Sequence, residues 1–308
     1  MENMKRLAVI YSPKVGFGGN NKIWLDIQRY MEKKGMEYDF VQSVGAGSVG
    51  RLSKMMCDNG YRTLVIVGND AALNEALNGI LKCETLPEDF ALGLIPNGIG
   101  NDFARFWGLA EGDYKKAVDR IVVRRLRRID VGYCVSHDKD NVPLKTYFLN
   151  CVNVGLGAKL VDLTVKATEV LRSSRLTTFS VGVANVFERK SFRMSVKVDT
   201  EQIDANVMSL CIGNCHGYGQ TPNSVPYNRQ LDVSLVTRPK WWQLLEGFWL
   251  LGKGRFLNYK NVHPYRTQCV ELYDVDKAKI SVDGCMLEST HLMPMRIGIE
   301  PEKLSFIV

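Results

Sequence analysis

Two short segments of the sequence carry carboxylates, amides and glycines at a spacing that suits phosphate binding. The first, "GNDAALNE", holds Gly68, Asp70 and Asn74 directly after the apolar run "TLVIV". The second, "PNGIGNDFAR", holds Asn101 and Asp102 after the apolar run "ALGLI". A helix that starts at such a turn offers backbone N–H groups and a partial positive charge to an anion. A carboxylate beside them can hold Mg²⁺ through water, so the two segments predict chemistry on a metal-bound phosphate.

A third turn of this kind, "SPKVGFGGN", starts at Ser12 after the run "RLAVIY". Each turn alone is weak evidence, because glycine-rich turns often follow strands for purely structural reasons. None is a Walker A loop, since no glycine-lysine-hydroxyl triplet follows, and none is a complete GxGxxG. For each aspartate the plain alternative is a helix N-cap. Three such turns at one edge of a parallel sheet, where ligands of α/β proteins bind, are stronger evidence than any one of them.

The elements around these turns alternate between strands and helices. Strands are predicted over 6–12 and at "EYDFVQS", "TLVIVG" and "ALGLIP", and helices over 21–35 and at "VGRLSKMMCDNG" and "AALNEALNGIL". This alternation is typical of a doubly wound parallel sheet with helices on both faces. We therefore predict an α/β nucleotide-binding domain over residues 1–130.

After about residue 130, short alternating or β-branched runs predict a mainly antiparallel β-sandwich over 131–302. Strands are expected at "TYFLNCVNVG", "MRIGIEP" and "LSFIV" among others, and the last of these, 303–308, is expected to return to the first domain. Helices are expected near 158–188 and 239–252. The basic run "RIVVRRLRRID" is interpreted as a solvated helix end and linker.

Composition narrows the classes of function. The 308 residues carry a net charge of +7, which favours an anionic partner without choosing among nucleotide, nucleic acid and membrane. The basic run lacks interleaved aromatic residues, so we expect no nucleic-acid binding. Neither a membrane span nor a signal peptide is recognisable, which predicts a cytoplasmic location. The scattered cysteines indicate free thiols, and Cys211, Cys215 and His216 lack a fourth ligand for zinc.

The motifs resemble those of the soluble lipid kinases of the diacylglycerol kinase and sphingosine kinase superfamily, especially its bacterial YegS-like branch, which is distantly akin to ATP-NAD kinases. The family sequence GGDGTxNExxNG is matched at Gly68, Asp70, Asn74, Glu75, Asn78 and Gly79. The family sequence PxGTGNDxAR is matched at Pro96, Gly98, Gly100, Asn101, Asp102, Ala104 and Arg105.

The resemblance implies ATP, Mg²⁺ and a lipid hydroxyl as substrate, with ATP along the three turns at the mouth between two domains. It implies that the catalytic base is Asp283, in "ISVDG", for which a hairpin-turn aspartate is the plain alternative. Asp70 and Asp102, the carboxylates at the two turns, are the candidate Mg²⁺ ligands. The implied nucleotide-binding residues are Ser12, Gly68, Asn69, Asp70, Ala71, Asn74, Glu75, Gly98, Gly100, Asn101, Asp102 and Arg105.

The departures from the family pattern gather where the nucleotide should bind. Two glycines and a threonine of the first motif are replaced by Asn69, Ala71 and Ala72, and the threonine of the second is Ile99. The family glutamate after Asp283-Gly284 is Cys285. An Asp-Gly pair associated with a structural Mg²⁺ is Asn228-Arg229, and an Asn-Pro pair is Ser12-Pro13.

The physical effects of these changes differ. We expect Asn69 to keep a left-handed turn, and Ala71 to be strained by about 1 kcal/mol if its φ is positive. Two lost hydroxyl donors would weaken nucleotide binding by ~10² or more.

Three functions remain open at this point. The first is an ATP-dependent lipid kinase that acts on a diacylglycerol-like lipid. The second is a kinase-like protein with weak or no catalysis, which would bind nucleotide or lipid as a regulator. The third is an NAD kinase-like enzyme with a soluble substrate. The oligomeric state is open, with a homodimer as one option.

The segment "PKWWQLLEGFWLLGKGRF" (239–256) is the candidate for contact with lipid. One helical stripe is expected to hold Trp241, Leu244, Leu245, Phe248 and Leu251, with Trp242 and Trp249 pointing elsewhere. A helix that is apolar on more than one face is usually buried. The alternative is an interfacial helix that enters an anionic membrane surface, which would make the protein peripheral.

Overall fold

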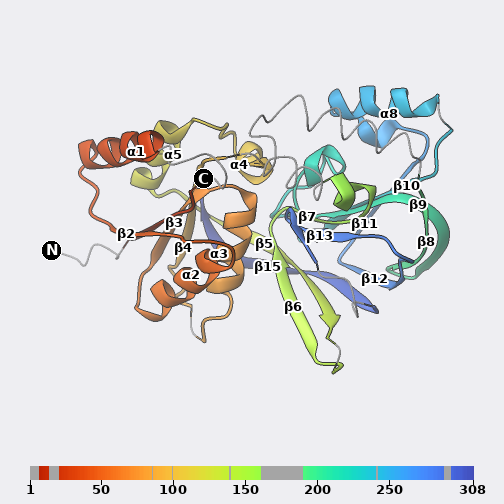
Figure 1. Ribbon diagram of the computed structural model, residues 1–308, viewed down its shortest axis with the longest axis horizontal. Helices are drawn as coiled ribbons and strands as arrows, with labels where there is room; N and C mark the ends of the chain where they lie inside the picture. The colour runs from red at the N-terminus through yellow and green to blue at the C-terminus, as the bar shows by residue number, and fades with distance from the viewer. Residues whose placement is uncertain are drawn as a thin grey trace. The chain divides into compact units, whose positions relative to one another are not determined.

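The computed structural model describes residues 7–13, 21–84, 86–98, 100–138, 140–160, 190–240, 242–287 and 293–308. The chain forms two compact units (Figure 1). One contains Met1–Ile129 together with Glu302–Val308, and the other contains Asp130–Pro301. Most of the glycine-rich segment after Pro13, Ile99, Trp241 and the predicted helix beyond residue 160 lie outside the described residues.

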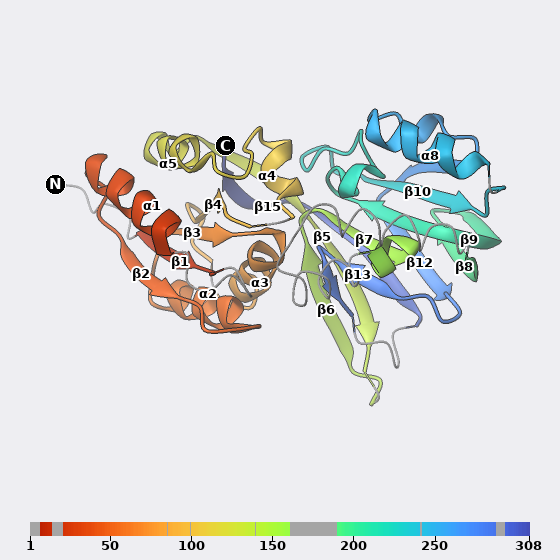
Figure 2. The same ribbon diagram turned by 45° about the horizontal axis from the view of Figure 1, so that its top comes forward.

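The first unit is built on a parallel sheet in the order β2-β1-β3-β4. Its elements are β1 (Leu7–Tyr11), α1 (Asn21–Lys33), β2 (Asp39–Gln42), α2 (Ser48–Asp58), β3 (Thr63–Gly68), α3 (Asp70–Ile80), β4 (Ala91–Pro96), α4 (Asp102–Phe106) and α5 (Tyr114–Val123). Every residue of β3 and β4 is buried, as expected for central strands covered on both faces. Figure 2 shows α1 and α5 over one face of this sheet and α2 and α3 over the other.

Helices α2 and α3 pack closely because two glycines face each other. A Cβ added at Gly79 would lie 2.1 Å from the carbonyl oxygen of Gly50. A Cβ at Gly50 would in turn lie 3.0 Å from the carbonyl oxygen of Glu75. The two helices therefore meet through their backbones, and this contact fixes α3 against α2.

The last strand, β15 (Met295–Ile307), reaches the first unit, where it lies parallel to β4 with Phe306 opposite Leu92. The sequence had predicted two separate strands, at "MRIGIEP" and "LSFIV", and that division is wrong. The polar residues between them are exposed, which gave a turn-like pattern. Glu302 takes a left-handed φ of 50° without ending the strand.

The prediction that "RIVVRRLRRID" is a helix end and linker is also only partly right. Helix α5 ends at Arg124, a left-handed C-cap with φ 53°, and β5 (Leu126–His137) begins two residues later. The first three residues of β5 are exposed, so their charges concealed a strand. The Arg124 guanidinium donates to the carbonyl of Asp89 at 3.0 Å and so ties the helix end to the loop before β4.

The second unit is mainly antiparallel. Its further elements are β6 (Pro143–Phe148), β7 (Cys151–Gly155), β8 (Phe192–Val198), β9 (Glu201–Gly213), a 3-10 turn η1 (Gly217–Gly219), β10 (Leu231–Thr237), α8 (Gln243–Gly252), a 3-10 turn η2 (Phe256–Asn258), β11 (Val262–Thr267), β12 (Cys269–Asp274), β13 (Ile280–Val282) and β14 (Cys285–Met286). Strands follow the order β14-β13-β7-β9-β8-β12-β15, with β10 joining β9 to β11 and β5 pairing with β6 and β15. The predicted fold class, a parallel α/β domain followed by an antiparallel β domain, is confirmed.

The run "TYFLNCVNVG" was predicted as one strand and is two. β6 ends at Phe148 and β7 begins at Cys151. The backbone N–H groups of residues 149–151 all point to the carboxylate of Asp283 instead of continuing one ladder.

Helix α8 covers a small apolar cluster of the second unit. Its buried side chains Leu244 and Leu250 pack with Val236, Phe256 and Tyr259. No helix in the described ranges is long and apolar enough to cross a membrane.

Candidate nucleotide site

The turn after β3 begins a helix, with Asn69 as its N-cap. The backbone of Asn69 is extended, at φ −106° and ψ −176°, and its side-chain oxygen accepts the N–H of Ala72 at 3.1 Å. The expectation of a left-handed Asn69 is therefore wrong. The strain that a positive φ would cause at Ala71 does not arise, because Ala71 lies inside α3 and its φ is not positive. Asparagine is among the best N-cap residues, and this explains the local conformation.

Gly68 is required by close packing at the end of β3. A Cβ there would lie 2.8 Å from the Cβ of Ala72 and 3.4 Å from that of Ser12. Ser12 is held at this position by its own N–H, which donates to the carbonyl of Val67 at 2.9 Å. The structure thus brings the predicted residues Ser12 and Gly68 together at the carboxyl ends of β1 and β3.

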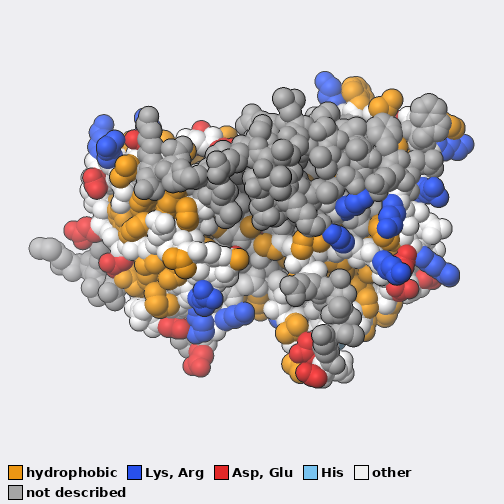
Figure 3. All heavy atoms as spheres, in the orientation of Figure 1, with side chains coloured by type: hydrophobic (Ala, Val, Ile, Leu, Met, Phe, Trp, Pro, Cys, Tyr) orange, Lys and Arg blue, Asp and Glu red, His pale blue; other side chains and the backbone are white. Residues whose placement is uncertain are grey.

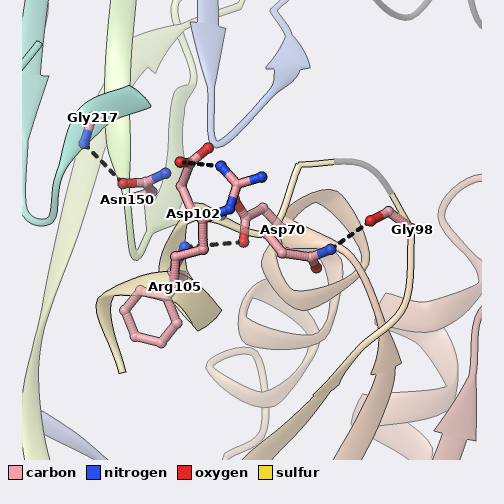
Figure 4. Close-up of polar contacts among 8 residues, drawn as sticks. Asp70, Gly98, Asp102, Arg105, Asn150 and Gly217 are labelled. Atoms are coloured by element: carbon pink, nitrogen blue, oxygen red, sulfur yellow. Dashed lines mark hydrogen bonds and ion pairs between the residues drawn. The ribbon is translucent and has the colours of Figure 1, made fainter. Parts of the chain in front are cut away.

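Asp70 ties the turn after β3 to the turn after β4 (Figure 4). Its carboxylate oxygens accept the N–H groups of Asp102 at 2.8 Å and Phe103 at 3.3 Å. Its own N–H donates to the carbonyl of Gly100 at 2.8 Å. Asp70 is only 5% exposed, so these bonds form in a dry environment where they are strong. The N-cap alternative weighed for the aspartates from the sequence therefore applies to Asp70, which caps α4.

The turn after β4 is shaped by two glycines and one amide. Gly98 and Gly100 have φ values of 118° and 80°, which L side chains rarely adopt. The side-chain amide of Asn101 donates to the carbonyl of Gly98 at 2.6 Å (Figure 4). Asn101 is 2% exposed, and its side-chain oxygen has no partner among the described residues. This oxygen is an acceptor that a donor from a ligand or water would satisfy.

Asp102 and Arg105 form an ion pair on the surface of α4. The Arg105 guanidinium lies 3.2 Å from the Asp102 carboxylate (Figure 4). The Arg105 side chain is 62% exposed and the Asp102 side chain 18%. Such a pair is weak enough to open for a charged ligand. The side chains of Asp70 and Asp102 therefore differ: the first is held by a helix end and the second faces an exposed cation.

The two predicted Mg²⁺ ligands do not form a protein-only metal site. Nowhere in the described part of the chain do three or more His, Cys, Asp or Glu residues gather at metal-binding distance. A Mg²⁺ ion brought in with a nucleotide would take most of its oxygens from phosphate and water, as this ion commonly does. Asp102 fits such an ion better than Asp70.

Four other motif residues have partners within or beside α3. Glu75 accepts the N–H of Gly47 at 3.0 Å, at the start of α2, and Gly79 packs against Gly50 of α2. The side-chain amide of Asn78 donates to the carbonyl of Asn74 at 2.9 Å, one turn away in α3 itself. Asn74 and Glu75, which were predicted as nucleotide contacts, therefore have structural partners.

The start of α3 offers an anion fewer donors than a bare helix N-terminus would. Of the N–H groups there that have no partner inside the helix, that of Asp70 donates to the Gly100 carbonyl and that of Ala72 to the Asn69 side chain. The Leu73 N–H makes the first ordinary helical bond, to the Asn69 carbonyl. Part of the donor set of the predicted phosphate-binding turn is therefore occupied from within the protein.

Asp283 lies in the second unit, between β13 and β14, at a left-handed φ of 46° that aspartate tolerates better than most residues. It is 2% exposed, and its carboxylate accepts the N–H groups of Leu149 at 2.7 Å, Asn150 at 2.9 Å and Cys151 at 2.8 Å. Burial, followed by the nearby charge of Asp283, raises the pKa of the Cys134 thiol to about 12. Asp283 is thus a structural anchor of the turn that leads into β7.

Sequence reasoning missed the buried amides around Asp283. Asn150 accepts the N–H of Gly217 at 3.1 Å (Figure 4), and Asn214 donates to the carbonyls of Asp130 and Leu149 at 3.0 Å each. Both asparagines are 1% exposed or less. The signal was an asparagine inside an apolar run, in "FLNCV" and "CIGNC", because a buried amide must find partners.

Two family models match the chain. Residues 6–134 match the diacylglycerol kinase catalytic domain, and residues 150–308 match the YegS C-terminal NAD kinase beta sandwich-like domain. The chain belongs to the diacylglycerol kinase family of YegS-like proteins. The resemblance inferred from the motifs is confirmed, and membership of this kinase family implies the use of ATP.

Relatives and solved structures agree along nearly the whole chain. It is 22% identical over 287 residues to a diacylglycerol kinase of Bacillus subtilis, which covers 91% of this chain and 90% of the relative. A diacylglycerol kinase of Staphylococcus carnosus is 23% identical over 286 residues, with 91% and 88% covered. A diacylglycerol kinase structure from Bacillus anthracis aligns with a TM-score of 0.68 at 14% identity, covering 98% of this chain and 96% of the other. Yeast NADH kinase aligns at 0.53 and 10% identity, covering 98% and 83%, which supports the fold alone.

Proposed function

We propose that the protein is an ATP-dependent lipid kinase that phosphorylates a hydroxyl of a diacylglycerol-like lipid at the membrane surface. In this proposal ATP lies along the turns after β1, β3 and β4, Mg²⁺ is held through Asp102, and Asp283 takes the proton of the acceptor hydroxyl. The observation that carries the proposal is the bond of Asp70 to the start of α4, because it holds the family's two nucleotide motifs together despite their substitutions.

Phosphoryl transfer asks little covalent chemistry of a protein. It needs the nucleotide and acceptor held in line and the growing charge neutralised. Mg²⁺, when bound, supplies part of that neutralisation. Arg105 would move from Asp102 toward phosphate, and the unpartnered oxygen of Asn101 would accept a donor from the ligand. Asp283, whose carboxylate accepts three backbone N–H groups, would be the acceptor of the hydroxyl proton.

A second candidate is a kinase-like protein with weak or no catalysis, which binds nucleotide or lipid as a regulator. The cap formed by Asn69 favours it, since the side-chain oxygen takes an N–H that a phosphate would otherwise use. Loss of hydroxyl donors at Ala72 and Ile99 acts in the same direction.

The deciding experiment is calorimetric titration with ATP, with and without Mg²⁺, followed by a phosphorylation assay on short-chain diacylglycerol. The kinase proposal expects Mg²⁺-dependent binding and a phosphorylated lipid. The variant Asn69→Gly/Ala71→Gly/Ala72→Thr/Ile99→Thr should gain roughly 2–4 kcal/mol in ATP binding if the natural site is weakened. Binding without turnover supports the regulator, and transfer to NAD would support the NAD kinase-like reading. A folded revertant that binds no ATP contradicts both nucleotide proposals.

The role of Asp283 needs a control for stability. Asp283→Asn replaces one acceptor oxygen by a donor that faces backbone N–H groups, so we expect about 1–3 kcal/mol of destabilisation besides lost turnover. Val154→Ala weakens the neighbouring buried strand β7 without touching the carboxylate, and serves as the matched control. If Asp283 is the base, only Asp283→Asn abolishes turnover, while ATP affinity stays nearly unchanged. Equal loss in both variants would leave Asp283 a structural residue.

A further inference from the structure

Helix α8 presents three large apolar side chains to solvent. Trp242, Leu245 and Trp249 are 53%, 62% and 59% exposed. At 3.6 residues per turn their spacing places them within about 60° of one another around the helix axis. We call these three residues the α8 face. The predicted stripe is therefore wrong where it can be tested: Leu244 is buried, and Leu245 shares its face with the two tryptophans that were expected elsewhere.

The opposite side of α8 is anchored, so the α8 face cannot turn inward. Leu244 and Leu250 are 3% and 8% exposed within their apolar cluster. A Cβ at Gly247 would lie 3.2 Å from the ring of Tyr259, which shows how closely the helix sits. Two tryptophans and a leucine exposed on one side of an anchored helix form an apolar patch, and such patches mark interaction surfaces.

Basic residues flank the α8 face along the chain. The ammonium of Lys240 lies 5.3 Å from the ring centroid of Trp242. Arg238, Lys253, Arg255 and Lys260 are also exposed, against one exposed acid on the helix, Glu246. In Figure 3, hydrophobic and basic side chains gather over α8 at the upper right.

We propose that the α8 face is a docking surface for an anionic lipid bilayer. Tryptophan favours the interfacial region, and lysine and arginine beside it pair with anionic headgroups. The flanking cations disfavour the other simple occupant, because a second copy meeting this same face would bring like charges together. The inference deepens the proposed function, on which it rests for the need to reach a lipid, by assigning the surface through which the membrane is met.

The first test measures binding of the full chain to vesicles of phosphatidylglycerol and phosphatidylcholine by flotation. Wild type should float with anionic vesicles, less so at high salt, and not with pure phosphatidylcholine. Trp242→Ser/Trp249→Ser should weaken binding by about ten-fold or more, because two indole rings no longer enter the interface. Lys253→Glu/Arg255→Glu should weaken it on the order of 25-fold at low salt, at about five-fold per cation.

Matched controls separate the α8 face from general hydrophobicity and charge. Val142→Ser/Leu144→Ser removes two exposed apolar side chains, 51% and 48% exposed, from the β5–β6 hairpin. Lys33→Glu/Arg51→Glu makes the same change of charge on exposed residues of α1 and α2. Both controls should float like wild type. Vesicle binding that survives the tryptophan variant, or falls equally in the controls, overturns the proposal.

Two further readouts distinguish the remaining outcomes. Light scattering that shows a wild-type dimer and a monomeric Trp242→Ser/Trp249→Ser variant, with no vesicle binding by either, would overturn the proposal in favour of a contact between copies. Activity on dispersed short-chain diacylglycerol should be unchanged in the α8 variants. If wild type lacks that activity yet floats as described, the proposed function fails and the docking surface stands.

Discussion

The side chain of Asn69 determines whether a backbone N–H at the start of α3 is bound within the protein or is open to a ligand. The Asn69 oxygen occupies the N–H of Ala72, so capping and phosphate binding compete for the same donor. Asn69→Gly should leave the free energy of unfolding within a few tenths of a kcal/mol, since glycine is a tolerable N-cap, while ATP affinity rises. Chemical denaturation and ATP titration measure the two effects.

Two control substitutions separate capping from charge. Asn69→Ala should lower the free energy of unfolding by about 1 kcal/mol through loss of the cap. Asn69→Asp should keep or improve stability, because a carboxylate caps well and complements the helix dipole, yet should weaken ATP binding by repulsion. The competition argument fails if Asn69→Gly and Asn69→Asp change ATP affinity in the same direction.

Tyr259, 3% exposed beneath α8, gives a pH-dependent test of the packing around that helix. Burial, with a smaller contribution from the charge of Glu246, raises its pKa from 10.0 to about 12. Between pH 10 and 12 the unfolded chain loses a proton that the native state keeps, so the free energy of unfolding falls as pH rises through this window. Below pH 10 the tyrosine is protonated in both states, and the stability that is lost in this window is fully present.

Tyr259→Phe should remove that part of the alkaline slope. The hydroxyl is buried with no partner among the described residues, so the variant should be as stable as wild type at pH 7, or up to about 1 kcal/mol more stable. Denaturation curves of both proteins across pH 8–12 test this. A variant that loses stability at pH 7 would show that the hydroxyl has a partner.

The positions of several candidate residues in the fold could be predicted from the sequence, and their partners could not. Asp70, Gly98 and Asn101 follow β3 and β4 as the motifs predicted, because turns with glycine and amides have local causes, and their contact with nucleotide stays a prediction. Asp70 can accept the N–H groups of Asp102 and Phe103 only because β3 and β4 are neighbours in the sheet. The local sequence around Asp70 does not contain this information. The N-cap at Asn69 could have been predicted, because asparagine is a favoured N-cap residue. A left-handed turn was predicted instead, because the family has glycine at this position.

At the scale of elements, the contact between α2 and α3 depends on glycine. Gly79→Ala would place a Cβ 2.1 Å from the carbonyl oxygen of Gly50, and backbone cannot yield as a side chain can. We expect a loss of about 1–3 kcal/mol or more from overpacking, in spite of the better helix propensity of alanine. The matched control is Gly252→Ala, at the end of α8, where a Cβ meets nothing within 4 Å and stability should hold or rise.

The same element-scale reasoning explains which helices and strands the sequence predicted. β3 and β4 were found because continuous apolar runs mark buried parallel strands. β5 was missed at its exposed basic start, and the break between β6 and β7 was missed because its cause, Asp283, lies more than 130 residues away. The local sequence pattern predicted strands that are buried along their whole length. It did not predict an element boundary that is set by a residue far away in the sequence.

At the scale of the whole molecule, the chain closes its first unit with its last residues. Phe306 is 1% exposed, with its ring centroid 5.1 Å from that of Phe103 and 5.9 Å from that of Trp107. The first unit therefore cannot be complete until the second has been synthesised, although it carries the N-terminus. Its stability depends on residues that are about 200 positions beyond its other strands.

Phe306→Ala should consequently destabilise the first unit, although most of that unit lies far from residue 306 in the sequence. Removing a fully buried aromatic side chain costs about 3–5 kcal/mol. Hydrogen exchange should accelerate in β3, β4 and α4, while β9 and β10 of the second unit keep their protection, because Phe306 packs on Phe103 and Trp107 and pairs with Leu92, all in the first unit. Tyr273→Ala, an aromatic truncation at a side chain 43% exposed in the second unit, should leave β3 and β4 unchanged. Exchange that accelerates equally in both units would mean that they unfold as one cooperative body, and unchanged exchange in β4 would mean that β15 contributes little to the parallel sheet.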